Sequence, residues 1–78
     1  MKIINNKKDA IKEFDKSIEI SPEEAEYFCL RGSCKYYLKR YEDAIKDLDK
    51  AIEIDIEHHL SWYIRGNCKF ELKKYENA

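Results

Sequence analysis

The segment RGSCK at residues 31–35 returns later in the chain as RGNCK at residues 65–69. The same offset places DKSIEI at residues 15–20 on DKAIEI at residues 49–54. A fixed period in the range of roughly 20–50 residues is typical of proteins built from stacked copies of one small structural unit. The sequence therefore predicts a repeat architecture in which residues 25–58 form one full unit.

The composition is that of a small folded protein with heavily solvated helices. The chain has 78 residues, of which 44% are hydrophobic and 40% are charged. Such a short chain buries only about 60% of the surface that its unfolded form exposes, so we expect modest stability. The net charge of -1 is spread over interspersed lysines and carboxylates, which gives no electrostatic reason to expect nucleic acid or a membrane as partner.

The sequence carries no signal for secretion or for disulfide bonds. No apolar run approaches the ~18 residues that a membrane span requires, and residues 1–6 lack the apolar core of a secretory leader. The three cysteines, Cys29, Cys34 and Cys68, are an odd number and fall inside expected helices. We therefore expect reduced thiols and a cytoplasmic protein.

Apolar residues recur at helical spacing in four segments. We expect helices over residues 7–20, 22–38, 41–54 and 58–72, with residues 75–78 beginning a fifth. Lys73 and Lys74 connect the last two segments and include no helix-breaking glycine. The alternative is therefore that the fourth helix continues through them.

The start of the second helix carries a boundary signal of three residues. Ser21 can accept a hydrogen bond from the free amides of the first turn, and Pro22 suits the first helical position. Glu24 can reach back in a capping box. We therefore expect this helix to begin at Pro22.

Gly32 and Gly66 both stand inside expected helices. Glycine in a helix interior costs up to ~1 kcal/mol relative to alanine, so its recurrence predicts a second helix that passes too close for a side chain. The neighbouring helix over residues 41–54 is expected to bury Leu48. The same helix is expected to expose its charged residues, Asp47 among them.

The repeat resembles the tetratricopeptide repeat, a helix-turn-helix unit whose period is about 34 residues. The family pattern places aromatic residues, glycine, alanine, phenylalanine and proline at fixed offsets. The matching residues are Ala10, Phe14, Pro22, Phe28, Gly32, Ala44, Leu48, Trp62, Gly66 and Ala78. Arg31 and Arg65 depart from the pattern where the family has leucine, and Lys35 and Lys69 where it has tyrosine. Ile56 stands where the family has a second proline.

The resemblance implies an all-α fold: a right-handed superhelical α-solenoid of antiparallel helix pairs, with about two and a third repeats. Residues 1–24 would be the second half of a repeat and residues 25–58 a complete repeat. Residues 59–78 would be the first helix of another repeat and the start of its second helix. Units of this family usually hold another protein, so the resemblance implies a protein-protein interaction scaffold with a protein or peptide partner.

The resemblance also implies where a peptide would bind. In the family the concave face takes five residues of each repeat, counted here by offset from Gly32 and Gly66. These residues are Glu26, Cys29, Ser33, Tyr36, Tyr37, Leu60, Tyr63, Asn67, Phe70 and Glu71. Aromatic rings supply contact area at low entropy cost, so this patch suits a peptide. The alternative is that Tyr36 and Phe70 belong mostly to the core.

Asn67 matches the asparagine with which some family members hold the C-terminal carboxylate of a peptide. That clamp also needs basic residues at neighbouring positions, since a bound carboxylate requires a fixed cation. The residues found there are Glu26, Cys29, Leu30, Leu60, Tyr63 and Ile64. We therefore do not expect a carboxylate clamp.

Metal binding and catalysis are not expected. His58 and His59 are adjacent, so they diverge by about 100 degrees on a helix, and the cysteines lack metal-ligand spacing. Neither a nucleophile-base-acid set nor a phosphate-binding glycine loop can be assembled from the sequence. We expect a non-enzymatic protein without a cofactor.

The alternative function is a structural segment of a longer solenoid. Trp62, Ile64, Phe70 and Leu72 would face water if the helix that carries them lacks a following partner. An exposed apolar patch of several hundred Å² usually becomes covered. The isolated chain is therefore expected to self-associate through its terminal helices, either symmetrically or head to tail.

Overall fold

Four α-helices follow one another: α1 (Lys7–Ile20), α2 (Ala25–Tyr37), α3 (Tyr41–Ile54) and α4 (His59–Glu76). The structure is a computed structural model that describes residues 6–76, with side chains for residues 6–74. No strand occurs within this described range. The predicted all-α class is confirmed.

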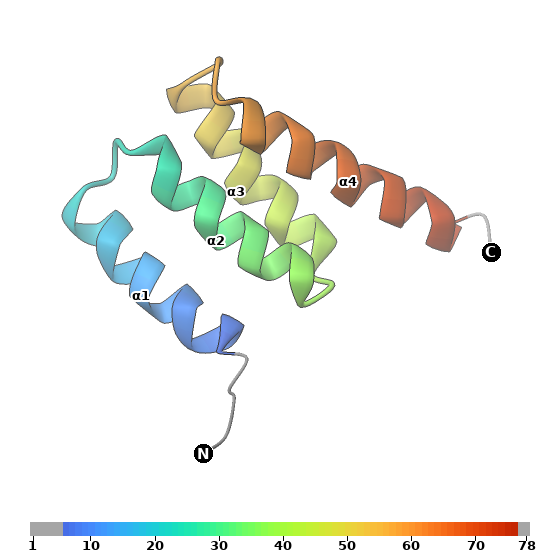
Figure 1. The fold of residues 1–78 in the computed structure, drawn as a ribbon, viewed down its shortest axis with the longest axis horizontal. Coiled ribbons are helices and arrows are strands. Elements are labelled where there is room, and N and C mark those ends of the chain that lie inside the picture. Colours follow the sequence, from blue (N-terminus) through green and yellow to red (C-terminus); the bar gives the residue numbers. More distant parts are fainter. Residues whose placement is uncertain (1–5, 77–78) are drawn as a thin grey trace.

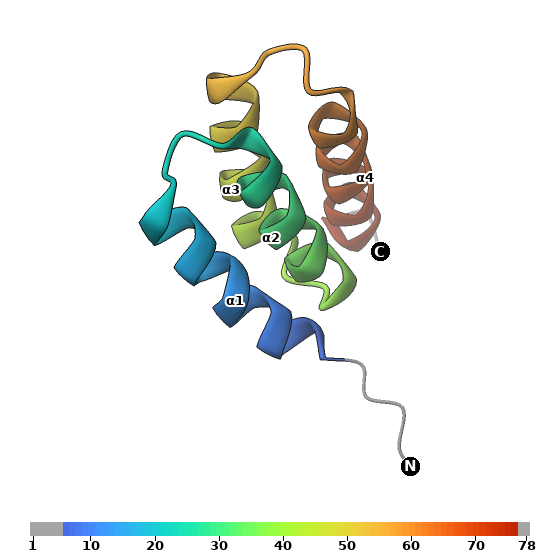
Figure 2. The ribbon, with the colours of Figure 1, turned by 60° about the vertical axis from the view of Figure 1, so that its left-hand side comes forward.

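Successive helices run in opposite directions and are joined by short turns (Figure 1). α2 packs against both α1 and α3, while α3 packs against both α2 and α4. Figure 2 shows α1 and α4 on opposite sides of the central α2–α3 pair. α2 and α4 also contact each other directly, so the two helices that begin their repeats lie side by side.

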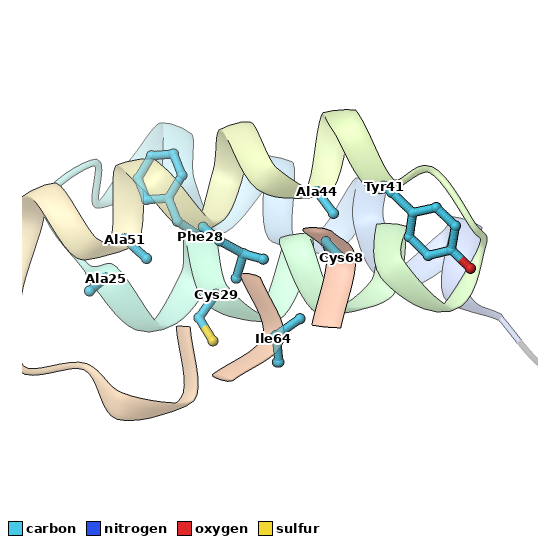
Figure 3. Close-up of a cluster of buried hydrophobic side chains, with 9 residues drawn as sticks. Ala25, Phe28, Cys29, Tyr41, Ala44, Ala51, Ile64 and Cys68 are labelled. Atoms are coloured by element: carbon cyan, nitrogen blue, oxygen red, sulfur yellow. The ribbon is translucent and has the colours of Figure 1, made fainter. Parts of the chain in front are cut away.

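The fully buried core comes from α2, α3 and α4 (Figure 3). Its residues are Ala25, Phe28, Cys29, Tyr41, Ala44, Leu48, Ala51, Ile64 and Cys68. Small residues on α3 let the helices approach closely. α1 contributes no fully buried residue, and its Ala10 and Phe14 are half-buried. α1 is therefore covered on one side only by the described residues.

Gly32 occupies a close crossing between α2 and α3. A Cβ atom at this position would lie 3.0 Å from Cγ of Leu48 and 3.2 Å from the carbonyl oxygen of Ala44. This confirms the predicted close approach. Gly66 differs, because a Cβ atom there would meet nothing within 4 Å. The repeated glycine thus has its packing partner in one repeat and not in the other.

The start of α2 differs from the prediction. Pro22 and Glu23 form a turn, and Glu24 is extended with φ -104 and ψ 109, so α2 begins only after it. Glu24 makes no side-chain cap bond, and Ser21 instead ends α1 by donating its amide to the carbonyl of Ser17 at 2.8 Å. The predicted capping box is therefore wrong, because these residues reverse the chain between two helices.

The end of α4 also differs from the main prediction. α4 continues past Lys73 and through Tyr75, so no fifth helix begins there. Lys39, the equivalent of Lys73 one repeat earlier, has a positive φ of 65 and stops α2. Lys73 carries no such backbone geometry, which agrees with the alternative of a continued helix. The predicted signature residue Ala78 lies outside the described residues.

Candidate functional site

Arg31 on α2 joins three helices through charged hydrogen bonds. Its Nε and Nη2 atoms donate to the two carboxylate oxygens of Asp47 on α3, at 2.9 and 2.7 Å. Its Nη1 atom donates to Asp15 on α1 at 2.7 Å. Hydrogen bonding to Asp47, reinforced by Asp15, raises the pKa of Arg31. This guanidinium therefore stays charged and holds consecutive repeats together.

Asp47 is the main correction to the predicted exposure pattern. It was expected to face water, yet it is only 5% exposed. A buried carboxylate is tolerated when it is paired and hydrogen-bonded, and Lys35 places its Nζ atom 3.0 Å from Asp47 in addition to the bonds from Arg31. Arg31 and Lys35 are two of the departures from the family pattern. Their joint appearance was the sequence signal for a buried acid opposite them.

Arg65 on α4 repeats part of this arrangement at the same offset. Its Nη1 atom lies 2.5 Å from a carboxylate oxygen of Asp49. The Nη1 atom of Arg31 makes the equivalent contact with Asp15. The guanidinium of Arg65 also lies 4.7 Å from the Trp62 ring. Within the described part of the chain, no second carboxylate pairs with Arg65. Arg65 thus has one of the two aspartate contacts that Arg31 has.

Eight of the ten predicted peptide-binding residues lie along the open sides of α2 and α4. We call these residues the inner surface: Glu26, Ser33, Tyr36, Tyr37, Leu60, Tyr63, Asn67 and Glu71. At one end, Nε2 of His58 lies 3.2 Å from Oε1 of Glu26 and links the two helix starts. At the other end, Tyr36 faces Glu71, whose carboxylate adds to the effect of partial burial in raising the pKa of Tyr36.

Tyrosine rings dominate the inner surface. Tyr37 is 64% exposed and Tyr63 is 67% exposed. The half-buried Tyr36 ring packs edge-on against Tyr37, with 5.1 Å between ring centroids. Like any tyrosine, Tyr36 is protonated at neutral pH and can donate a hydrogen bond. Tyr36 also packs against the core, as the alternative interpretation proposed.

Cys29 does not belong to the inner surface, and Phe70 lies at its edge. Cys29 is fully buried, so it cannot touch a partner, and its assignment as a binding residue is wrong. Phe70 is 63% exposed and stands about two helical turns after Tyr63, so it lies between the inner surface and the stripe of α4 that carries Trp62 and Gly66. That stripe is called the α4 stacking face below and consists of Trp62, Arg65, Gly66 and Lys69.

Ser61, His58 and Glu26 form a hydrogen-bonded series that the sequence analysis missed. Oγ of Ser61 lies 2.8 Å from Nδ1 of His58, whose Nε2 atom faces Glu26. The order resembles a nucleophile, a base and an acid. However, Ser61 has no exposed surface, so a substrate cannot reach its hydroxyl. The series ties the start of α4 to the start of α2, although Glu26 and His58 lie far apart in the sequence.

An open pocket of about 490 Å³ lies near the turn between α2 and α3. Its lining residues are Lys39, Arg40, Tyr41, Glu42, Asp43 and Leu72.

Over the described residues, no group of three histidine, cysteine or acidic side chains is arranged to hold a metal ion. None of the described helices is long and apolar enough to cross a bilayer.

A comparison with protein families identifies the class. The family model described as anaphase-promoting complex, cyclosome, subunit 3 matches residues 4–78. The chain belongs to this family. It is a tetratricopeptide-like repeat family, so the resemblance seen in the sequence is confirmed. No individual curated protein gives a significant match.

Families of this repeat type generally mediate protein-protein interactions and are generally non-enzymatic. In this member of the anaphase-promoting complex, cyclosome, subunit 3 family, two regions of α4 carry exposed side chains. One is the inner surface, shared with α2. The other is the α4 stacking face, whose α2 counterpart is covered by α3.

Proposed function

We propose that this chain is a protein-protein interaction module that binds a peptide segment of its partner along the inner surface. The observation that supports the proposal is the pair of exposed tyrosines, Tyr37 and Tyr63, on neighbouring parallel helices. Tyrosine presents a large rigid contact area and a hydroxyl at low entropy cost, which suits recognition of extended or helical peptides.

Polar groups beside the rings define the chemistry of the peptide. The amide of Asn67 can both donate to and accept from a peptide backbone. Glu26 and Glu71 place carboxylates toward the two ends, and none of the residues that define the inner surface is a lysine or arginine. These features favour an internal peptide segment with apolar side chains and a basic residue, and they do not favour a free C-terminal carboxylate.

Selection from a random-peptide display library, followed by fluorescence anisotropy with a labelled selected peptide, tests the proposal. Tyr37→Ala combined with Asn67→Ala removes one ring and the amide from the inner surface without touching the core. This variant should bind the peptide about tenfold or more weakly, because truncation of a central aromatic contact commonly costs more than about 1 kcal/mol. Its far-ultraviolet circular dichroism should match that of the wild type.

The matched control is Ile56→Ala combined with Glu57→Ala, which trims two exposed side chains in the turn between α3 and α4, away from the inner surface. The control should bind as the wild type does. If binding survives in the inner-surface variant but is lost on Trp62→Ala, the peptide occupies the α4 stacking face and the proposal fails.

A further inference from the structure

The interface between α2 and α3 shows how one repeat half packs on another. On the α2 side it is built around Phe28, Arg31, Gly32 and Lys35, and on the α3 side around Ala44, Asp47, Leu48, Ala51 and Ile54. The repeat offset carries the α2 set onto α4 and the α3 set onto α1. The residue types of both halves therefore occur a second time in the sequence, on helices α4 and α1, which lie on opposite sides of the α2–α3 pair (Figure 2).

The α4 half is the α4 stacking face already defined. The α1 half is called the α1 stacking face and consists of Ala10, Glu13, Phe14, Ser17 and Ile20. Each of its residues stands one repeat period before the corresponding α3 residue. The two faces are complementary in position along the helix, because α2 and α3 already show which residue meets which.

Both stacking faces are only partly covered by the described residues. Trp62 is 43% exposed, whereas its counterpart Phe28 is 8% exposed. Ile20 is 71% exposed, whereas its counterpart Ile54 packs against the core. These differences arise from neighbouring helices, since the residue types are similar and apolar in each pair. Large apolar side chains at a helix face normally become covered.

We propose that the α4 stacking face of one copy of this chain binds the α1 stacking face of a second copy, in the arrangement that α2 and α3 adopt within the chain. The association is head to tail, and the second copy continues the row of helices. This partner is distinct from the peptide proposed for the inner surface.

Charge complementarity favours a second copy of this chain as the partner of the α4 stacking face. Arg65 uses Nη1 for Asp49, which leaves Nε and Nη2 for another acceptor, and these are the atoms through which Arg31 holds Asp47. The counterpart of Asp47 on the α1 stacking face is the exposed Glu13. Glu13 of the second copy can therefore accept hydrogen bonds from Arg65 while it also pairs with Lys69.

The same charges argue against symmetric pairing. Two α4 stacking faces in contact would bring Arg65 and Lys69 against their own copies, and two α1 stacking faces would oppose Glu13 with itself. Like charges at an interface are unfavourable, while opposite charges fix register and partner. Only the α4-to-α1 contact joins positive to negative groups.

Steric fit is provided by Gly66. Within the chain, Leu48 reaches Gly32 so closely that a Cβ atom there would lie 3.0 Å from its Cγ atom. The equivalent space over Gly66 is open, and the counterpart of Leu48 is Phe14. Phe14 of the second copy can therefore pack over Gly66, beside Trp62. A large side chain at residue 66 would fill this space without clashing inside its own chain.

A head-to-tail contact leaves one stacking face free at each end. Such a heterologous contact adds further copies unless the assembly closes into a ring. Sedimentation velocity over a concentration series should therefore show the average mass of the wild-type chain rising beyond that of two copies. Trp62 is the only tryptophan. Its fluorescence emission should shift to shorter wavelength as the mass increases, because the stacking face becomes buried.

Two variants block one face each. Gly66→Leu fills the α4 stacking face, and Glu13→Lys reverses the charge that meets Arg65 and Lys69. Each variant alone should remain monomeric at concentrations about tenfold above those at which the wild type associates, with unchanged helicity. Glu23→Lys makes the same charge change in an exposed turn and should associate as the wild type does.

Mixing the two blocked variants is the decisive experiment. Gly66→Leu retains a free α1 stacking face and Glu13→Lys retains a free α4 stacking face, so an equimolar mixture should form heterodimers that grow no further. A mixture that stays monomeric while the wild type associates would overturn the proposal. A wild-type chain that stays monomeric, or that stops at a symmetric dimer unaffected by both variants, would overturn it equally.

Discussion

Arg31 and Asp47 join α2 to α3 through two nearly parallel hydrogen bonds, of 2.9 Å from Nε and 2.7 Å from Nη2. Both carboxylate oxygens are used, and such bidentate charged bonds are short and geometrically specific. Asp49 accepts from Arg65 through one N–H group, and its carboxylate side chain is 53% exposed. These two arginine-aspartate pairs therefore differ in burial and in the number of hydrogen bonds that join them.

Alanine at Asp47 should destabilise the fold far more than alanine at Asp49. Asp47→Ala leaves Arg31 and Lys35 close together without their shared carboxylate, and removal of one member of a buried pair costs roughly 3–5 kcal/mol. Asp49→Ala removes an exposed pair, for which at most about 1 kcal/mol is expected. Urea unfolding of both variants at low protein concentration checks the difference. Equal free energies of unfolding would mean that burial of Asp47 contributes nothing.

Alanine at Gly32 and Gly66 should have effects of opposite sign. Gly32→Ala places a Cβ atom 3.0 Å from Leu48 and 3.2 Å from a backbone oxygen, so we expect a loss of about 1–2 kcal/mol. Gly66→Ala meets nothing within 4 Å and gains helix propensity, so a stabilisation of about 0.5–1 kcal/mol is expected. Thermal unfolding of monomeric samples measures both. Destabilisation by both substitutions would contradict the difference in packing.

The three cysteine thiols should react at different rates. Burial raises the pKa of all three thiols, that of Cys68 to about 11. Cys34 alone is partly exposed, and the charge of Lys7 offsets part of the rise in its pKa. A disulfide reagent at pH 8 should therefore modify Cys34 first, because the accessible thiolate is the reactive species. Cys34→Ser should abolish the fast phase. Rapid reaction of all three thiols in the native state would contradict the described burial.

Periodicity predicted the features that repeat within the chain. Gly32, Leu48 and the helix positions follow from spacing, because a helix presents one face at regular intervals. The burial of Asp47 could not be read in this way, since it depends on Arg31, which lies on another helix and well before Asp47 in the sequence. Pro22 was misplaced because the same short polar sequence can cap a helix or reverse the chain. Local preference therefore indicated the elements but not every boundary.

The candidate site shows a second limit of reasoning by offset. Cys29 and Tyr63 occupy equivalent positions in successive repeats, and the sequence assigned both to the concave face. α4 packs beside α2, so Cys29 is fully buried, whereas no described helix covers Tyr63 in the same way. Equivalent positions in a repeat thus share a direction on the helix but not an environment.

The connection after each first helix has almost the same sequence in both repeats, LKRY at residues 38–41 and LKKY at residues 72–75. Lys39 takes a left-handed backbone conformation, which costs a non-glycine residue roughly 1–2 kcal/mol, and α3 folds back onto α2. Lys73 is helical, and α4 continues past it without a turn. The same four-residue pattern therefore occurs once at a turn between two helices and once inside a continuous helix. If a further helix docked beside α4 as α3 docks on α2, a turn would have to form at Lys73, so unwinding of α4 at this residue and docking would be one coupled equilibrium.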